Sequence, residues 1–122
     1  KLLKNHPRIV SCVLSVLDGK TRIPEHVGYS KFVLRYMLPI DIPKGDVKLC
    51  LNQDTIRWNE GKSLLWDDTF PHQVHNNTTL PRTVLYMDVM RFPWLTPLFN
   101  YIITNSSIIQ DEVKRTEKKV PI

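Results

Sequence analysis

Short apolar runs separated by turn residues constrain this chain more than any other feature of its sequence. The three longest runs span residues 8–17, 30–40 and 82–90, and they are rich in β-branched and aromatic side chains. Such residues favour strands, whereas glycine, proline and asparagine interrupt strands and form turns. Shorter runs of the same kind occupy residues 46–51, 56–58, 62–68 and 72–77. Six or more short strands predict an all-β fold, either a sandwich or a small barrel.

The end of the chain follows a different pattern. Thr96-Pro97 is typical of a helix start, with a capping residue followed by proline at the first helical position. We therefore predict a β domain over residues 1–95 and a helical, basic tail over residues 96–122. The chain begins with Lys1, so we expect it to be a fragment of a longer product, with part of the domain missing at the N-terminal side. The basic residues of the tail are Lys114, Arg115, Lys118 and Lys119.

Composition and charge exclude several classes of protein. The chain has 122 residues, of which 42% are hydrophobic and 24% charged, and this balance is typical of one folded domain. No apolar run approaches the ~20 residues that a membrane-spanning helix needs. Basic and aromatic residues do not alternate as in a nucleic-acid platform, so we expect no nucleic-acid partner. The basic tail is either a solvated helix, which we favour, or a peripheral contact with an acidic membrane surface.

Two arginines lie within the predicted strands. In the run over residues 30–40, alternation places Arg35 and Met37 on one face, and both faces are largely apolar. Arg82 stands at the head of a second strand of this kind. A buried guanidinium without an anion costs several kcal/mol, so each arginine needs a carboxylate. That carboxylate belongs either to a bound acidic ligand or to an internal salt bridge with Asp67, Asp68 or Asp88.

Two histidines stand beside turn residues. His26 follows Pro24-Glu25 at what we interpret as the entry to a strand, and His72 follows Phe70-Pro71 at the start of another. A histidine after a turn is usually a surface or capping residue. Two neutral imidazoles at strand ends that meet at one barrel mouth could instead share a divalent metal.

Several segments together resemble the aspartyl/asparaginyl β-hydroxylase domain, a branch of the iron(II)/2-oxoglutarate oxygenases. The resemblance spans residues 15–93 and rests on a Trp-x-Glu-Gly turn, an Asp-Asp-x-Phe-x-His segment and an arginine ten residues after that histidine. It implies a double-stranded β-helix, which is a jelly-roll, cupin-like barrel. The segments are "HVG" (26–28), "LRYMLPIDIP" (34–43), "WNEGKSLLWDDTFPHQVHN" (58–76) and "LPRTVLYMDV" (80–89).

The resemblance implies a role for each matching residue. His26 and His72 match the two iron-binding histidines, and Gly28 matches the glycine that this branch has where its relatives have an acidic ligand. Arg82, helped by Ser15, matches the arginine that holds the distal carboxylate of 2-oxoglutarate. Arg35 matches an arginine beside the proximal carboxylate. The implied reaction inserts one oxygen atom of O2 into a substrate C–H bond, with succinate and CO2 as co-products.

One departure from the family pattern bears on activity. The family has "LR-x-HLGL", whose histidine contacts the co-substrate, whereas this chain has Met37 in that place and Pro39 for the glycine. A thioether donates no hydrogen bond. The domain is therefore either a hydroxylase with altered co-substrate binding or a degenerate, non-catalytic binding module. Its substrate, an amino acid, a peptide or a lipid acyl chain, is not fixed by the sequence.

Overall fold

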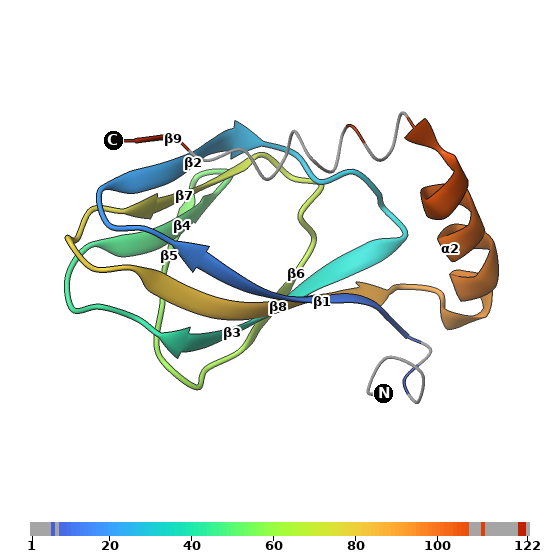
Figure 1. The fold of residues 1–122 in the computed structure, drawn as a ribbon, viewed down its shortest axis with the longest axis horizontal. Helices are drawn as coiled ribbons and strands as arrows, with labels where there is room; N and C mark the ends of the chain where they lie inside the picture. Colours follow the sequence, from blue (N-terminus) through green and yellow to red (C-terminus); the bar gives the residue numbers. More distant parts are fainter. Residues whose placement is uncertain (1–5, 7, 108–110, 112–119, 122) are drawn as a thin grey trace.

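Two antiparallel sheets form the body of the protein (Figure 1). The computed structural model describes residue 6, residues 8–107, residue 111 and residues 120–121. One sheet has the strand order β1-β8-β3-β6 and the other the order β5-β4-β7-β2-β9. The elements are β1 (Ile9–Leu17), β2 (Thr21–His26), β3 (Val33–Asp41), β4 (Val47–Leu51), β5 (Asp54–Arg57), β6 (Leu64–Trp66), β7 (His72–Asn76), β8 (Arg82–Met90), the 3-10 helix η1 (Pro93–Leu95), α2 (Thr96–Asn105) and β9 (Val120–Pro121).

Most connections between consecutive strands cross from one sheet to the other. Strands β1, β3, β6 and β8 lie in one sheet, and β2, β4, β5 and β7 lie in the other. The long central pairings are β1 with β8 and β3 with β8, both antiparallel. Sequence neighbours thus face each other across the core while strands distant in sequence pair, as in a jelly roll. The predicted all-β sandwich is confirmed.

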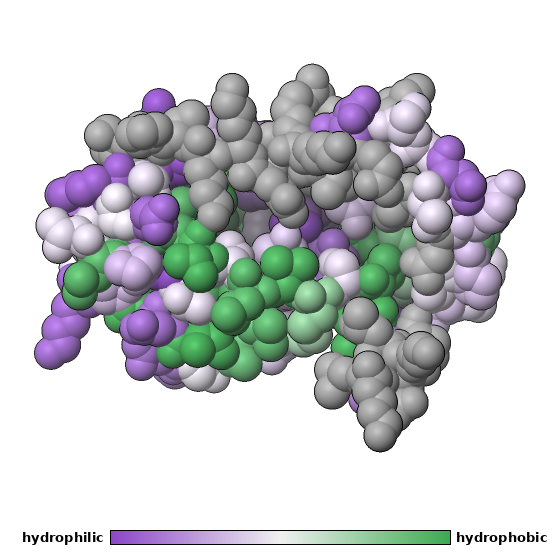
Figure 2. Space-filling model, in the orientation of Figure 1, coloured by the Kyte–Doolittle hydropathy of each residue, from purple (hydrophilic) through white to green (hydrophobic). Residues whose placement is uncertain are grey.

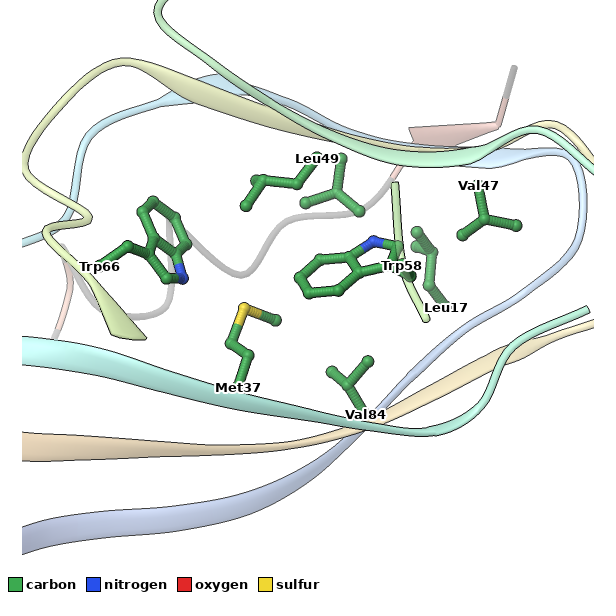
Figure 3. Packing of buried hydrophobic residues seen from close by; sticks show 8 residues of the cluster. Leu17, Met37, Val47, Leu49, Trp58, Trp66 and Val84 are labelled. Carbon is green, nitrogen blue, oxygen red and sulfur yellow. The ribbon is translucent and has the colours of Figure 1, made fainter. Parts of the chain in front are cut away.

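The main hydrophobic core lies between the two sheets. Met37 of β3 and Val84 of β8 meet Leu49 of β4, and Figure 3 shows the Met37 side chain between the indoles of Trp58 and Trp66. Leu49 and Val84 are fully buried. The aliphatic core side chains come from alternate positions of strands, so they follow the period-2 pattern of the sequence. The buried members of this cluster are Leu17, Met37, Val47, Leu49, Trp58, Trp66, Val74 and Val84.

Helix α2 stands at one end of the sandwich (Figure 1), where β3 begins and β8 ends. Phe99 of α2 packs there against Val33 and Met90 in a second, smaller hydrophobic cluster. The helix begins at Thr96, one residue earlier than predicted, and Leu95 is its N-cap. The Thr96 hydroxyl donates to the Pro93 carbonyl at 2.7 Å and does not cap the helix. Over the described residues, no helix has both the length and the apolar character to cross a membrane.

The tail after α2 is described only in part. Val120 and Pro121 form β9, which pairs with Thr21 and Arg22 of β2 and so adds a short strand to the second sheet. The basic residues expected in the tail, Lys114, Arg115, Lys118 and Lys119, lie outside the described residues.

Strand β2 is the element that the sequence did not predict. We expected His26 at the entry to a strand, but it is the last residue of β2. Pro24 lies inside this strand, and a proline within a run argues against a strand because it has no N–H to donate. The pairing of β2 with β7 is irregular between Ile23 and His26, and Pro24 falls within that irregularity. The proline thus lies at an irregularity of the ladder, where a residue without an N–H is tolerated.

Asn76 ties three segments together at the other end of the sandwich. It is fully buried, and its amide donates to the carbonyls of Leu17, Asp18 and Leu80 at 2.8–3.1 Å. Its side-chain oxygen accepts a hydrogen bond from the Thr78 hydroxyl at 2.7 Å. One side chain thus satisfies backbone groups at the ends of β1 and β7 and in the loop before β8.

We predict that Asn76→Ala lowers the free energy of unfolding by about 2–4 kcal/mol, because buried carbonyl groups lose their donor. Urea denaturation of both proteins measures this difference. Asn59→Ala, at an exposed turn position, is the matched control and should change stability by less than about 0.5 kcal/mol. Equal effects of the two substitutions would show that Asn76 does not hold these segments together.

Candidate functional site

A cavity of about 210 Å³ lies between the two sheets and collects all six residues that the sequence singled out. His26 and His72 come from the second sheet, and Arg35, Arg82 and Ser15 come from the first. Met37 is the sixth. The other residues that line the cavity are apolar or aromatic, namely Val13, Leu14, Val16, Ile23, Trp66, Val74 and Tyr86. The cavity therefore holds a few polar groups within an apolar wall, as small-molecule sites do.

The two histidines face each other across paired strands. His26 and His72 are register partners in β2 and β7, and their ring centroids are 4.1 Å apart. Each ring makes the same local hydrogen bond, from Nδ1 to the carbonyl oxygen two residues earlier, at 2.8 Å for Pro24 and 2.8 Å for Phe70. A carbonyl only accepts, so Nδ1 carries the proton and Nε2 keeps its lone pair. Such an outer hydrogen bond is what fixes the ring of a metal-ligating histidine.

Burial keeps His72 neutral. The His72 side chain is 3% exposed, and burial lowers its pKa from 6.5 to about 4. The Phe70 carbonyl works in the opposite direction, and the positive charge on His26 or Arg35 adds to the lowering. Trp66 stands edge-on to the His72 ring, with centroids 4.7 Å apart. A neutral imidazole at neutral pH is the form that binds a metal.

Gly28 lies where a side chain has no room. A Cβ atom at this position would overlap the carboxylate of Asp68, and the Gly28 N–H donates to the Asp68 backbone carbonyl at 2.6 Å. An acidic residue at position 28 would therefore displace Asp68. The structure thus gives a steric reason for glycine here, because Asp68 already fills the space beside the histidines.

Asp68 is almost fully buried, at 1% exposure. Burial raises the pKa of its carboxyl, while nearby Arg35 and His26 partly counteract this effect. Its Oδ2 lies 3.3 Å from Nη2 of Arg35, and its Oδ1 has no hydrogen-bond partner among the described residues. Among the residues that the structure describes, no three His, Cys, Asp or Glu side chains are arranged to hold a metal ion.

Arg82 is a buried cation with no described anion. The residue is 1% exposed, and its Nε and Nη1 atoms have no hydrogen-bond partner among the described residues. Burial alone lowers the pKa of this guanidinium to about 10, so it remains charged at neutral pH. Its nearest described π partner is Trp58, whose ring centroid is 6.0 Å away. An unpaired buried charge of this kind calls for an anionic ligand.

Arg35 is held differently, by carboxylates of the protein. Its Nε and Nη2 atoms donate to Oδ1 of Asp88 at 3.1 and 3.0 Å, and its guanidinium lies 4.6 Å from the centre of the Tyr86 ring. Burial lowers its pKa, but the negative charges of Asp88 and Asp68 outweigh this and raise it. The internal salt bridge that the sequence left open is thus present for Arg35. No such bridge is described for Arg82.

The Asp88 carboxylate that holds Arg35 is itself saturated. Its Oδ2 accepts hydrogen bonds from Ser11 at 2.9 Å and from Tyr29 at 3.2 Å. Burial, together with the negative charge of Asp88, raises the pKa of the Tyr29 hydroxyl well above its usual range, so it stays a donor. Sequence reasoning missed Tyr29, because nothing in the pattern around it indicates a polar partner. It named the Trp58 turn but gave the indole no role beside Arg82.

Met37 and Ser15 are the remaining two of the six predicted residues that line the cavity. Met37 is 6% exposed and is part of both the main core and the cavity wall. Ser15 lies on β1, opposite Val84 of β8, and is half-buried at the cavity. Both positions are consistent with contact to a ligand in the cavity, although Met37 brings no hydrogen-bond donor to it.

Sequence comparison identifies relatives of known activity. The model of the family described as aspartyl/asparaginyl beta-hydroxylase matches residues 1–92. The chain is 30% identical over 112 residues to the ornithine lipid ester-linked acyl 2-hydroxylase of Rhizobium tropici, which covers 88% of this chain and 40% of that protein. It is 33% identical over 101 residues to the human aspartyl/asparaginyl beta-hydroxylase, with 79% and 13% covered. The chain thus spans less than half the length of either relative.

Comparison with solved structures confirms the cupin-like jelly roll. A predicted oxalate decarboxylase from Thermotoga maritima superposes with a TM-score of 0.57 at 11% identity, over 74% of each chain. A cupin protein from Bacteroides fragilis superposes with a TM-score of 0.54 at 15% identity, over 66% of this chain and 64% of that one. At such low identity these likenesses show the fold alone.

The lowered pKa of His72 makes a prediction about stability in the metal-free protein. Because the folded state resists protonation of His72, the unfolded state binds more protons between pH 6.5 and about 4. The free energy of unfolding should therefore fall by about 3 kcal/mol from this residue as the pH drops from 7 to 4. Denaturant titrations with a chelator present, across this pH range, measure the loss.

His72→Gln should remove most of this pH dependence, whereas His6→Gln, at an exposed position, should leave it unchanged. A wild-type profile that is parallel to that of the His72 variant would contradict the burial of a neutral imidazole.

Proposed function

This chain belongs to the aspartyl/asparaginyl β-hydroxylase family, and we propose that it forms the core of an iron(II)- and 2-oxoglutarate-dependent hydroxylase. The reaction inserts one oxygen atom of O2 into a C–H bond of the substrate and yields succinate and CO2. One observation carries the proposal: a buried arginine with no described anionic partner shares a small cavity with two histidines whose Nε2 atoms make no hydrogen bond within the described residues. That combination suits an acidic co-substrate beside a metal.

His26 and His72 would hold the metal through Nε2. Their Nδ1 atoms are used by backbone carbonyls, which fixes each ring and its tautomer. When bound, iron(II) supplies the activation of O2 that no side chain can provide. Two protein ligands leave more coordination positions open than three would. Asp68 fills the space at Gly28 and is expected to stay outside the first coordination shell, as is Asp67, whose Oδ1 accepts from Thr69.

Arg82 would bind the distal carboxylate of 2-oxoglutarate. Its Nε and Nη1 atoms have no hydrogen-bond partner among the described residues, so both can donate a charge-assisted hydrogen bond to an anionic ligand. Ser15 stands in the same cavity and can add a hydroxyl donor. The carboxylate would supply the counter-charge that the described residues do not provide.

The proximal end of the co-substrate meets a different environment. The Nε and Nη2 atoms of Arg35 already donate hydrogen bonds to Asp88. The Met37 side chain has no hydrogen-bond donor. Val74, Tyr86 and Trp66 line the cavity around this end and exclude water. We therefore infer weaker co-substrate binding than in a member that has histidine at position 37, by about 1.5–3 kcal/mol for one charge-assisted hydrogen bond.

The rim of the cavity favours an acyl chain as substrate. The cavity volume of about 210 Å³ lies below the ~300–1,000 Å³ of typical ligand pockets, so the co-substrate leaves little space for a second molecule. Val13, Leu14 and Val16 of β1 line the cavity and are also 41, 60 and 39% exposed. Figure 2 shows hydrophobic side chains gathered over β1 beside a hollow in this face. An apolar rim suits the acyl chain that the Rhizobium relative hydroxylates better than a charged side chain.

A non-catalytic binding module is the second candidate, and Met37 is the observation that favours it. The retained His26, His72 and Arg82 oppose it, because an interaction domain without metal and co-substrate gains nothing from a buried cation that no described carboxylate balances.

The function is tested by separating metal binding from anion binding. With manganese in place of iron to prevent turnover, calorimetry should show metal and 2-oxoglutarate binding in the wild type. Arg82→Ala should keep the metal and weaken 2-oxoglutarate about a hundredfold or more, the loss expected for a buried charge pair. His26→Ala/His72→Ala should lose the metal. Arg57→Ala, with a side chain 65% exposed, is the control and should change neither.

Unchanged 2-oxoglutarate affinity in Arg82→Ala would place the anion site elsewhere. No metal and no keto-acid binding by the wild type would favour the binding module. If both bind, succinate release with iron(II) and ascorbate, screened across hydroxyl-free acyl lipids and peptides, identifies the substrate class.

The departure at position 37 makes its own prediction. Residues 35 and 37 share a strand face, so Met37→His should place a donor beside the proximal carboxylate and tighten 2-oxoglutarate binding about tenfold. Met90→His is the matched control, since Met90 is equally buried but lies in the second hydrophobic cluster. Calorimetric titration compares them. Equal or weaker affinity in the Met37 variant would show that the cavity has repacked around methionine.

A further inference from the structure

The outer side of η1 and α2 exposes large apolar side chains. Trp94 is 76% exposed, Leu98 56%, Tyr101 67% and Ile102 43%. Leu98, Tyr101 and Ile102 are spaced i, i+3 and i+4 and so share one helix face, and Trp94 precedes Leu98 by about one turn. The neighbouring side of the helix is already packed, because Phe99 lies against Val33 and Met90. The helix therefore shows an apolar face to the outside as well as to the core.

The helix that carries this face is uncharged, and the charged groups described beside it are Lys31 and the Arg91–Asp67 ion pair. Helix α2, Thr96–Asn105, has the sequence TPLFNYIITN and contains no charged residue. Phe92 and Phe32 extend the apolar surface: the ring of Phe92 is 6.3 Å from that of Trp94, and the ring of Phe32 is 6.4 Å from that of Phe99. Lys31, next to Phe32, is exposed. Arg91 donates from Nε to the Lys31 carbonyl at 3.0 Å but is ion-paired with Asp67, so Lys31 is the basic residue beside the face that has no described ion pair.

We propose that this face binds the surface of a lipid bilayer that contains anionic headgroups. Tryptophan and tyrosine prefer the headgroup level, where one part of the ring is apolar and the other meets water, while leucine and isoleucine suit the acyl boundary below. Lys31 and the net charge of +5 favour anionic lipids over neutral ones. The η1–α2 surface consists of Phe32, Phe92, Trp94, Leu98, Tyr101 and Ile102.

Two features favour a bilayer over a second copy of this chain. A stable protein–protein interface uses about 20–30 residues on each side, whereas six exposed apolar side chains make up this surface. Two copies would also bring together two chains of net charge +5, which repel each other. A bilayer needs neither a large complementary area nor an opposite protein charge. This inference rests on exposure and charge and is independent of the reaction in the cavity.

Trp94 provides a built-in reporter for the test. The other two tryptophans, Trp58 and Trp66, are each 7% exposed, so a change in tryptophan emission on membrane contact comes from Trp94. The full chain is mixed with vesicles of phosphatidylcholine alone or of phosphatidylcholine with phosphatidylglycerol. We expect co-sedimentation with the anionic vesicles, a shift of emission to shorter wavelength, and quenching by brominated acyl chains. Salt and Lys31→Glu should weaken this binding.

Substitutions then locate the surface. Trp94→Ser/Leu98→Ser should weaken vesicle binding about tenfold or more, since two apolar side chains leave the membrane. Leu65→Ser/Leu80→Ser is the matched control, at positions 56 and 61% exposed outside this surface, and should bind as the wild type does. Circular dichroism and thermal melting verify folding, and Tyr101→Asp is the second variant if the first does not fold.

Three results would overturn the proposal. These are no binding of the wild type to anionic vesicles, equal binding by the wild type and the surface variants, or a concentration-dependent dimer without vesicles that Trp94→Ser/Leu98→Ser abolishes. The last result would assign the surface to a second copy of the chain.

Discussion

The guanidinium of Arg82 lies inside an apolar sandwich with two of its nitrogen atoms unpartnered among the described residues, and the rest of the site is arranged around that charge. A domain of this size is stable by about 5–15 kcal/mol in total, and an uncompensated buried ion costs several kcal/mol. The arginine stands at the start of β8, the strand that pairs with both β1 and β3. Arg82 itself pairs with Leu17 of β1, and the register with β3 begins at the next residue, Thr83. The carboxylate of the proposed co-substrate would relieve this cost, and its binding would then add to the stability of the sandwich.

The two arginines that line the cavity differ in what balances their positive charge. Arg35 is neutralised within the protein, by Asp88 on the paired strand β8 and by Asp68 beside the histidines. Asp68 thereby links the two ends of the site, because it neighbours both Arg35 and Gly28. Arg82 has no described carboxylate to match it. The cavity thus keeps one positive charge for its ligand, and the internal pair fixes the wall against which that ligand would lie.

Much of this arrangement could be predicted from the sequence, because it depends on strand alternation. Alternation placed Arg35 and Met37 on one face and predicted that both arginines are buried. The runs over residues 30–40 and 82–90 became β3 and β8. Strand β2 could not be predicted, since Pro24 argues against a strand unless the bulge beside it is known. The choice between a ligand and a salt bridge for each arginine also depends on three-dimensional proximity. Nothing in the order of residues says that Asp88 lies beside Arg35 and that no described carboxylate lies beside Arg82.

The two departures from the family pattern, Met37 and Pro39, fit the fold locally. This bears on whether the site has lost its function. Pro39 is fully buried, and its carbonyl accepts from the Gly61 N–H at 3.1 Å. In a strand the N–H and C=O of one residue point to the same side, so the donor that proline lacks would have faced the 61 turn and not β8. The β3–β8 ladder therefore loses nothing. Met37 fills the space between two indoles at 6% exposure, and a flexible thioether suits such an irregular gap. A site under no constraint accumulates voids and unsatisfied groups at random. Here the polar groups without partners include Arg82 and Asp68, beside the cavity, and the substituted positions are well packed. This pattern supports the proposal that the cavity binds an anionic ligand.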